Sequence, residues 1–198
     1  MDKIKEILIG TNNVGKYKEI CGLLPKKVKK YSPKDFKISS PEETGKSFKE
    51  NSLIKASYFS KKTNLICLSD DSGLKIDLLN GLPGIYSSRW GGEKNSFDFA
   101  MEKVFKEMKK TKENWHYNNK ATFVCCLTIF WPNGKIFFSE GIVNGKISKE
   151  KKGNNGFGYD PIFIPDGYNE TFGEMDPKLK ASIDHRFKAY MRIKNFFN

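Results

Sequence analysis

Along the first half of the chain, short apolar runs alternate with segments in which apolar residues recur every three or four positions. Such runs predict β-strands, and such spacing predicts helices. The apolar runs cover residues 4–9, 36–39 and 65–68. The helical segments lie around residues 20–24, where Pro25 ends the helix, and over residues 47–62 and 96–110. This alternation favours an α/β protein.

The second half of the chain adds a predicted β-hairpin. Two long apolar runs, residues 120–131 and 135–143, are joined by Pro132-Asn133-Gly134, and both Asn and Gly tolerate positive φ. Residues 81–92 and 153–159 are rich in glycine and predict loops, and residues 177–197 predict a closing helix. A hairpin among alternating strands and helices predicts a mixed sheet, and the length predicts a single domain over residues 1–198.

The composition is that of a globular protein, and we expect the protein to be cytoplasmic. The hydrophobic fraction of 38% and the aromatic fraction of 14% supply enough apolar surface for a core. No apolar stretch is long enough to cross a bilayer, and the start of the chain lacks the apolar region of a secretory signal. The four cysteines form no CxxC pair, and three lie in apolar runs, so we expect reduced core residues rather than a zinc site.

The chain carries 35 Lys and Arg residues against 23 Asp and Glu residues, a formal charge of +12. A field of that sign attracts polyanions, which include nucleic acid, anionic membranes and free nucleoside triphosphates. The ordinary interpretation of lysine runs such as Lys26-Lys27 is a solvated surface, and we favour it. Charge alone therefore does not identify the partner.

The loop after the first predicted strand reads Gly10-Thr11-Asn12-Asn13-Val14-Gly15-Lys16. It opens a helix, and backbone N–H groups at a helix N-terminus bind phosphate. The spacing is that of a Walker A loop, but Tyr17 stands where that loop needs a small hydroxyl for Mg²⁺, which argues against a P-loop ATPase. An anion site and an ordinary strand–helix turn both remain as interpretations.

Two acidic pairs are candidate metal ligands. Asp70-Asp71 follows a predicted buried strand, where ligands of α/β sheets bind, and Glu42-Glu43 lies in another loop. Mg²⁺ prefers a few carboxylate oxygens together with water and substrate phosphates. Adjacent residues of an extended chain point to opposite faces, so we expect one member of each pair to face the metal. The alternatives are a solvated surface for the glutamates and an Asx turn for the aspartates.

A late segment has the chemistry of a base-binding site. Phe157 lies among glycines and offers a ring for stacking, and Asp160 offers an acceptor for a ring N–H. Lys180 and Arg186 only donate hydrogen bonds, so they favour a 6-keto purine over adenine. The alternative interpretations are core filling for Phe157 and a solvated helix face for His185-Arg186.

Taken together, these segments resemble the inosine triphosphate pyrophosphatase family, the Ham1-like enzymes. The resemblance extends from about residue 7 to residue 197. The segments that carry it, in family order, are Thr11-Asn12-Asn13-Val14-Gly15-Lys16 with Glu19, Glu42-Glu43-Thr44-Gly45, Phe48 with Glu50-Asn51 and Lys55, Ser69-Asp70-Asp71-Ser72-Gly73-Leu74, Gly81-Leu82-Pro83-Gly84-Ile85-Tyr86-Ser87-Ser88-Arg89, Gly156-Phe157-Gly158-Tyr159-Asp160-Pro161, and Lys180 with His185-Arg186.

The resemblance implies a fold, an activity and an assembly. The implied fold is an elongated two-lobed α/β structure with a central mixed sheet flanked by helices, and the implied assembly is a homodimer. The implied activity is hydrolysis of ITP, dITP and XTP to the monophosphate and pyrophosphate, with Mg²⁺ as cofactor, which cleanses the nucleotide pool. No membrane and no specific nucleic acid is expected as a partner.

The resemblance also implies a role for each matched residue. Glu42 and Asp71 would hold Mg²⁺, and Asp71 would be the catalytic residue that takes a proton from the attacking water. The triphosphate would be bound by Thr11, Asn13, Lys16, Lys55 and Ser72. The base pocket would be formed by Phe157, Gly158, Tyr159, Asp160, Lys180, His185 and Arg186.

The chain departs from the family pattern at two positions. Asn12 stands where the family commonly has glycine, which removes backbone freedom from the first loop. Asp184 stands where the family has serine before His-Arg, and its carboxylate would pair with Arg186 or Lys180 and alter the base preference.

Two alternative functions are weighed against this one. A pyrophosphatase of Maf type would act on modified pyrimidine triphosphates. A basic nucleic-acid-binding protein would use the positive charge, but the sequence has no RNA-recognition or helix-turn-helix signature.

Overall fold

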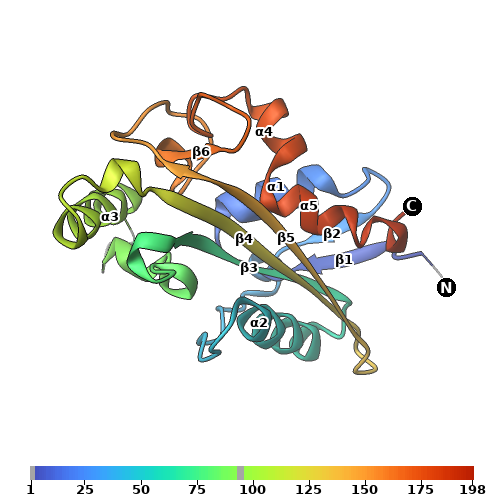
Figure 1. Ribbon diagram of the computed structural model, residues 1–198. Helices are drawn as coiled ribbons and strands as arrows, with labels where there is room; N and C mark the ends of the chain where they lie inside the picture. Colours follow the sequence, from blue (N-terminus) through green and yellow to red (C-terminus); the bar gives the residue numbers. More distant parts are fainter. Residues whose placement is uncertain (1–2, 93–95) are drawn as a thin grey trace. The chain divides into compact units, whose positions relative to one another are not determined.

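The computed structural model describes residues 3–92 and 96–198, and it confirms the α/β class with a mixed sheet (Figure 1). The strands of the described residues are ordered β2-β1-β3-β4-β5-β6. They are β1 Glu6–Ile9, β2 Lys29–Tyr31, β3 Cys67–Ile76, β4 Lys120–Phe130, β5 Ile136–Ile147 and β6 Phe163–Pro165. β1 pairs parallel with β2 and β3, whereas β5 pairs antiparallel with β6.

The longer helices begin at side chains that cap their first N–H groups. Asn13, Ser47 and Ser96 each accept a hydrogen bond from a backbone N–H of the following turn. The α-helices are α1 Val14–Leu23, α2 Phe48–Thr63, α3 Phe97–Thr111, α4 Pro177–Ile183 and α5 His185–Met191. The short 3₁₀ helices are η1 Pro33–Phe36, η2 Asp77–Leu79, η3 Gly84–Tyr86, η4 Arg89–Gly91, η5 Trp115–Tyr117, η6 Asp160–Ile162 and η7 Lys194–Phe196.

The chain divides into two compact units. The first unit contains the described residues of Met1–Asp71, with Cys125–Gly141 and His185–Asn198. The second unit contains those of Ser72–Val124 and Ile142–Asp184. Each unit has its own hydrophobic core.

In the first unit, helices cover both faces of the β1 region of the sheet. Ile7 and Ile9 of β1 belong to one buried cluster with residues of α1 and α5, and Leu8 belongs to another with Ala56 and Phe59 of α2. Figure 1 shows α2 on one face of these strands and α1 with α5 on the other. Because successive side chains of a strand point to opposite faces, one short apolar run serves both cores.

In the second unit, α3 packs its apolar face into an aromatic core. Ala100 and Val104 of α3 are fully buried in a cluster with Leu74 of β3. Phe123 and Phe163 lie in the same cluster, with ring centroids 4.6 Å apart. The helical spacing over residues 96–110 therefore marks the buried face of α3.

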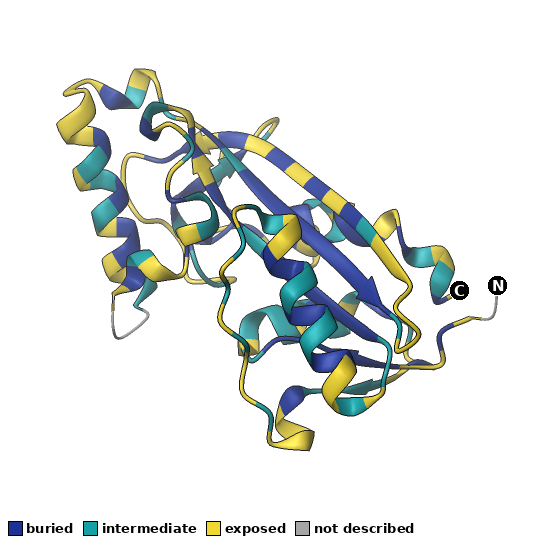
Figure 2. Cartoon of the chain, turned by 90° about the horizontal axis from the view of Figure 1, so that it is seen from below, coloured by how far each residue is buried: buried dark blue, intermediate teal, exposed yellow. Residues whose placement is uncertain are grey.

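The strand β5 shows the alternation of a sheet with one covered face. From Ser139 to Ile147, buried and exposed residues alternate without interruption, which Figure 2 shows as bands along the strand. β4 and β5 are neighbours, joined at the predicted turn, where Gly134 has a positive φ of 86°. In the part of the chain that the structure describes, Cys21, Cys67, Cys125 and Cys126 form no disulfide, and the last three are buried, as expected.

The strand predicted over residues 36–39 is wrong. Pro33–Phe36 form a 3₁₀ helix, and Lys37 follows in the left-handed region with φ 54°. Asp35 closes this turn by accepting the N–H of Ser32 at 2.8 Å, which a search for apolar runs does not detect. The second strand of the chain is instead β2, a lysine-rich edge strand.

The single closing helix over residues 177–197 is also wrong. The chain forms α4, then Asp184 in extended conformation (φ −70°, ψ 169°), and then α5. The break at Asp184 places Lys180 on one helix and Arg186 on another.

The strand predicted at residues 65–68 is longer than expected. β3 continues through the acidic pair to Ile76, so the interpretation of Asp70-Asp71 as an Asx turn is wrong. The loop predicted at residues 81–92 contains two short 3₁₀ helices, η3 and η4.

Gly141 of β5 tests the packing of α5 in the first unit. A Cβ added there would lie 2.0 Å from the His185 carbonyl oxygen and 2.3 Å from the Ala189 nitrogen, both backbone atoms of α5. We expect Gly141→Ala to lower the free energy of unfolding by roughly 2 kcal/mol or more. Gly22→Ala is the control, because its Cβ meets no atom within 4 Å and alanine favours a helix. Equal urea midpoints for the two variants would contradict this packing.

Candidate functional site

The first loop lies directly against β3. A Cβ at Gly10 would lie 2.1 Å from Ser69 Oγ, so only glycine fits between β1 and α1 at this position. The Ser69 hydroxyl donates to the Gly10 carbonyl oxygen at 3.0 Å. The loop that precedes Lys16 is therefore fixed to the residue that precedes Asp70.

The side chains of the first loop hold its own backbone. Thr11 Oγ1 accepts the N–H of Asn13 at 3.2 Å, and Asn13 Oδ1 accepts the N–H of Lys16 at 3.0 Å. Asn12 donates to Ser40 Oγ at 2.9 Å. Among the described residues other than glycine, positive φ occurs at Lys37, Asn64 and Asn80, so Asn12 needs no glycine-like backbone. The departure from glycine at this position therefore causes no strain.

Asp70 and Asp71 are adjacent in β3 and contact different cations. Asp70 Oδ2 lies 3.2 Å from Lys16 Nζ, and Asp71 Oδ1 lies 3.2 Å from Lys55 Nζ. Both aspartates are buried. As expected for an extended chain, the two side chains point to opposite faces. Each therefore belongs to its own charge cluster, one with a lysine of α1 and one with a lysine of α2.

The Asp70 cluster is a buried network of alternating charge. Arg186 Nη2 of α5 also lies 3.2 Å from Asp70 Oδ2, and Arg186 Nη1 donates to Glu19 of α1. Burial alone would raise the pKa of Asp70, but the charges of Lys16 and Arg186 outweigh it and hold this pKa well below its usual range. Asp70 is therefore an ionised anchor for two cations.

Arg186 is not on a solvated helix face. Its guanidinium is fully buried and binds Glu19 and Asp70, so that alternative interpretation is wrong. The sequence did not identify Glu19 as a member of a charge cluster. Its position three residues after Lys16 on α1 is the available signal, because such residues share one face of a helix.

The second cluster centres on Lys55. Its ammonium donates to Glu43 Oε1 and to Asp71 Oδ1. Burial by itself would lower the pKa of Lys55, but the charges of Asp71, Asp70 and Glu43 outweigh it and raise that pKa above its ordinary value. For Asp71, burial outweighs the opposing charge of Lys55, and its pKa is raised.

The acidic loop is fixed to the start of α2. The N–H of Gly45 donates to Asn51 Oδ1 at 2.8 Å, and the N–H of Lys46 donates to Glu50 Oε2 at 2.7 Å. Ser47 caps the helix by accepting the N–H of Glu50. Glu50 and Asn51 therefore orient the loop that carries Glu43.

Glu43, rather than Glu42, lies in the same charge cluster as Asp71. Glu42 is exposed, whereas Glu43 shares the ammonium of Lys55 with Asp71. Asp71 Oδ2 is buried and has no hydrogen-bond partner among the described residues. In residues 3–92 and 96–198, no three Asp, Glu, His or Cys side chains form a metal cluster by themselves. The carboxylates of Asp71 and Glu43 fit Mg²⁺, because the Asp71 Oδ2 described above can bind the ion and Mg²⁺ takes its remaining ligands from water and phosphates.

The second unit contains a buried ion pair between Lys180 and Asp160. Lys180 Nζ lies 3.1 Å from Asp160 Oδ2, and the same oxygen accepts the N–H of Phe157 at 2.8 Å. A Cβ at Gly156 would lie 2.1 Å from that oxygen, and Gly156 has φ 75°. The glycines around Phe157 therefore let the loop close on Asp160.

Tyr159 is a core residue of the second unit. Its hydroxyl donates to the Ser87 carbonyl oxygen at 2.8 Å, and its ring packs edge-on against Phe97. Burial raises the pKa of this hydroxyl. Tyr159 supports the loop, and its polar atom is already bound within the protein.

Lys180 has a second carboxylate and two aromatic rings beside it. Asp184 Oδ2 lies 3.8 Å from Lys180 Nζ, so of its two expected partners Asp184 is seen to contact the lysine. The ring centroids of Phe157 and Phe172 each lie 5.7 Å from Nζ. Lys180, Asp160 and Asp184 are all buried.

The predicted site residues fall into both units. The first unit holds Thr11, Asn13, Lys16, Glu42, Lys55, Asp71, His185 and Arg186, and the second holds Ser72, Phe157, Gly158, Tyr159, Asp160 and Lys180. Within the first unit the structure brings Lys16 to Arg186 through Asp70. Within the second it brings Lys180 to Asp160 and Phe157.

A buried strand that carries two carboxylates with shifted pKa values, each paired with a lysine from a different helix, is a candidate site for phosphate and metal in an α/β protein. Comparison with known proteins identifies the family. A model of the Ham1 family matches residues 7–196. The chain therefore belongs to the Ham1 family.

Individual relatives cover the chain almost completely. It is 39% identical over 188 residues to a dITP/XTP pyrophosphatase of Rhodospirillum centenum, covering 94% of this chain and 92% of that protein. It is 39% identical over 198 residues to a dITP/XTP pyrophosphatase of Oceanobacillus iheyensis, covering 98% and 99%. Its structure is similar to that of a HAM1 protein from Coxiella burnetii, with a TM-score of 0.87, 34% identity and 96% coverage of both chains.

The pH dependence of the free energy of unfolding tests the buried network around Asp70. At neutral pH, Asp70→Asn leaves Lys16 and Arg186 without their shared anion, and we expect it to lower the free energy of unfolding by about 3 kcal/mol. Because the folded pKa of Asp70 lies below its usual value, this stabilisation is complete above the ordinary pKa of about 4 and is lost as the pH falls through the folded value.

The measurement is urea unfolding of metal-free protein across an acidic pH series. The difference between wild type and Asp70→Asn narrows below about pH 4. Asp166→Asn is the control, because Asp166 is exposed. A difference that stays constant with pH would contradict an ionised Asp70.

Proposed function

We propose that this chain hydrolyses the non-standard purine nucleoside triphosphates ITP, dITP and XTP to the monophosphate and pyrophosphate. The observation that carries the proposal is the pair of lysine–carboxylate clusters on β3, in a chain that belongs to the Ham1 family. The relatives named dITP/XTP pyrophosphatase support this substrate class. Water cleaves the anhydride between the α- and β-phosphates, so one of the two P–O bonds of the bridging oxygen breaks.

We assign Mg²⁺ as the cofactor and Asp71 with Glu43 as its protein ligands; Glu42 is the alternative predicted from the sequence. When bound, Mg²⁺ neutralises phosphate charge and lowers the pKa of a coordinated water. The chain's own contribution is positional. Asp71 Oδ2, which has no hydrogen-bond partner within the described residues, takes a proton from the attacking water, and Lys55 holds Asp71 and Glu43 together.

The remaining roles follow from the same chemistry. Lys16 exchanges part of its contact with Asp70 for the triphosphate, because a lysine that is partly exposed can turn toward a phosphate. The other residues proposed for the triphosphate are Thr11, Asn13, Lys55 and Ser72. Those proposed for the base are Phe157, Gly158, Tyr159, Asp160, Lys180, His185 and Arg186.

The cellular context is also a proposal. Four cysteines that form no disulfide among the described residues suit a reducing compartment, which supports the cytoplasm. No helix among the described residues is long and apolar enough to cross a membrane. The homodimer implied by the family resemblance stays a prediction, which light scattering on the purified chain checks.

A panel of nucleoside triphosphates with Mg²⁺ tests the activity. We expect pyrophosphate as the first product, and a kcat/KM for ITP and dITP that exceeds the value for ATP by at least about 100-fold, because a site built for a keto oxygen rejects an amino group. The measurement is separate quantification of pyrophosphate and orthophosphate. Orthophosphate as first product, ATP as the best substrate, or a preference for modified UTP would each overturn the proposal.

Lys16 tests the phosphate end of the site. Lys16→Ala removes a phosphate contact that does not depend on the base, so we expect KM to rise roughly tenfold for ITP, XTP and GTP alike. Lys18→Ala is the control, because Lys18 is exposed on the same helix. A loss confined to one base would remove Lys16 from the phosphate contacts.

A further inference from the structure

Lys180 of the second unit lies between two buried carboxylates. Its ammonium is 3.1 Å from Asp160 Oδ2 and 3.8 Å from Asp184 Oδ2, and the side chains of all three are almost completely buried. Asp184 reaches the lysine because it follows α4 directly, four residues after Lys180 on the chain. These three side chains together carry one positive and two negative charges.

The two carboxylates differ in their surroundings. Asp160 Oδ2 accepts the backbone N–H of Phe157 as well as the lysine, so Asp160 is bound into the fold of its loop. Asp184 stands at the end of α4, where the chain is extended before α5 begins. Asp160 therefore orients Lys180 and the Phe157 loop, and Asp184 adds negative charge to a lysine that already has an anionic partner.

The rings beside Lys180 mark where a base would be bound. Phe157 and Phe172 each present a ring 5.7 Å from the ammonium, and Phe172 is fully buried whereas Phe157 is partly exposed. A planar base that stacks on Phe157 comes within reach of the same lysine and carboxylates. Lysine only donates hydrogen bonds, and carboxylates only accept them.

We infer that Asp184 is a specificity-determining residue that makes this chain favour ITP and dITP over XTP. The inference rests on the proposed function, because it assigns the base of that substrate to Lys180. Hypoxanthine offers a keto oxygen to Lys180 and a ring N–H to a carboxylate. Xanthine has a second keto oxygen, which is a hydrogen-bond acceptor and would face carboxylates that also only accept. Near neutral pH it also readily loses a ring proton and becomes anionic. A second carboxylate beside the lysine repels such a base.

The first test uses the wild-type protein. We expect kcat/KM for ITP to exceed that for XTP at least about fivefold in neutral buffer, since like-charge contacts at a binding site oppose association. We also expect inosine monophosphate to bind more tightly than xanthosine monophosphate, measured by calorimetry without metal. Equal values for the two bases in both measurements would overturn the inference.

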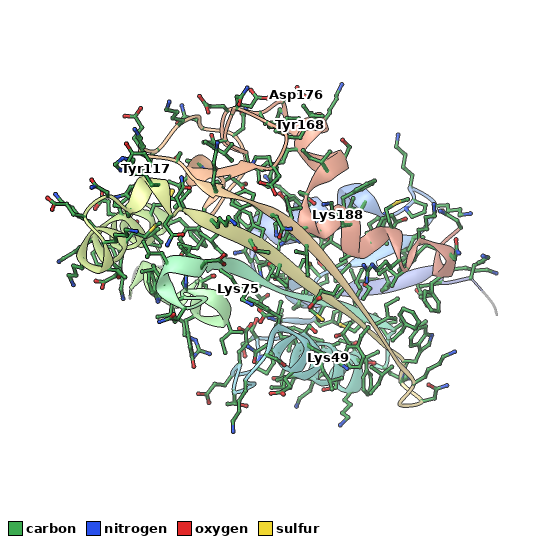
Figure 3. All side chains as sticks on the ribbon, in the orientation of Figure 1. Lys49, Lys75, Tyr117, Tyr168, Asp176 and Lys188 are labelled. Atoms are coloured by element: carbon green, nitrogen blue, oxygen red, sulfur yellow. The ribbon has the colours of Figure 1, made fainter. Side chains whose placement is uncertain are left out.

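The second test neutralises Asp184 while preserving its shape. Asp184→Asn should raise the XTP:ITP ratio of kcat/KM at least about fivefold and narrow the difference in monophosphate affinity. Asp176→Asn is the matched control. Asp176 is the exposed N-cap of the same helix, labelled in Figure 3, and asparagine caps a helix equally well. An unchanged ratio in Asp184→Asn, or an equal change in both variants, would overturn the inference.

The outcomes separate this inference from the proposed function. If wild type releases no pyrophosphate from ITP, the proposed function fails. If ITP is hydrolysed but the XTP:ITP ratio does not respond to Asp184, the inference alone fails. If Asp184→Asn does not fold, the wild-type preference between the two monophosphates still decides the inference.

Discussion

The pairing of two adjacent aspartates with lysines from two different helices is the constraint on which the first unit depends. β3 is buried, and a buried carboxylate needs a cation or several hydrogen bonds. Because side chains alternate between the two faces of a strand, Asp70 contacts Lys16 of α1 and Arg186 of α5, whereas Asp71 contacts Lys55 of α2. The first loop is held against β3 by Gly10, and the acidic loop is held against α2 by Asn51. The positions of Lys16 and Glu43 follow from these contacts.

The two aspartates have opposite effects on folding. Asp70 has a lowered pKa, so its charge stabilises the folded state, whereas Asp71 has a raised pKa, so its charge opposes folding at neutral pH. Such a cost is typical of a residue kept for function. Two cations, Lys16 and Arg186, meet Asp70 at one oxygen, whereas Asp71 contacts Lys55 through one oxygen and its other oxygen has no hydrogen-bond partner among the described residues.

Much of the fold was predictable because its signals are local. Periodicity gave α2, α3 and the hairpin of β4 and β5, and the ordered motifs gave the family. The sequence did not predict the break at Asp184, because no glycine or proline stands there to signal a helix end. It also did not predict that Glu43 contacts Lys55 or that Glu19 contacts Arg186, since both contacts depend on which side chain meets a cation from another segment. The hydrogen bond from the Tyr159 hydroxyl to the Ser87 carbonyl oxygen also had no sequence signal, and the place of Tyr159 at the base stays a prediction.

The most direct test of this account compares stability and turnover in one variant, Asp71→Asn. We expect release of pyrophosphate from ITP to fall by roughly 10²–10⁴-fold, the usual contribution of a general base. We also expect the free energy of unfolding of the metal-free protein to stay the same or rise at neutral pH, because the variant removes a charge that burial disfavours. Near wild-type turnover, or a loss of activity that comes with a loss of stability, would contradict the assignment of Asp71 to chemistry and Asp70 to structure.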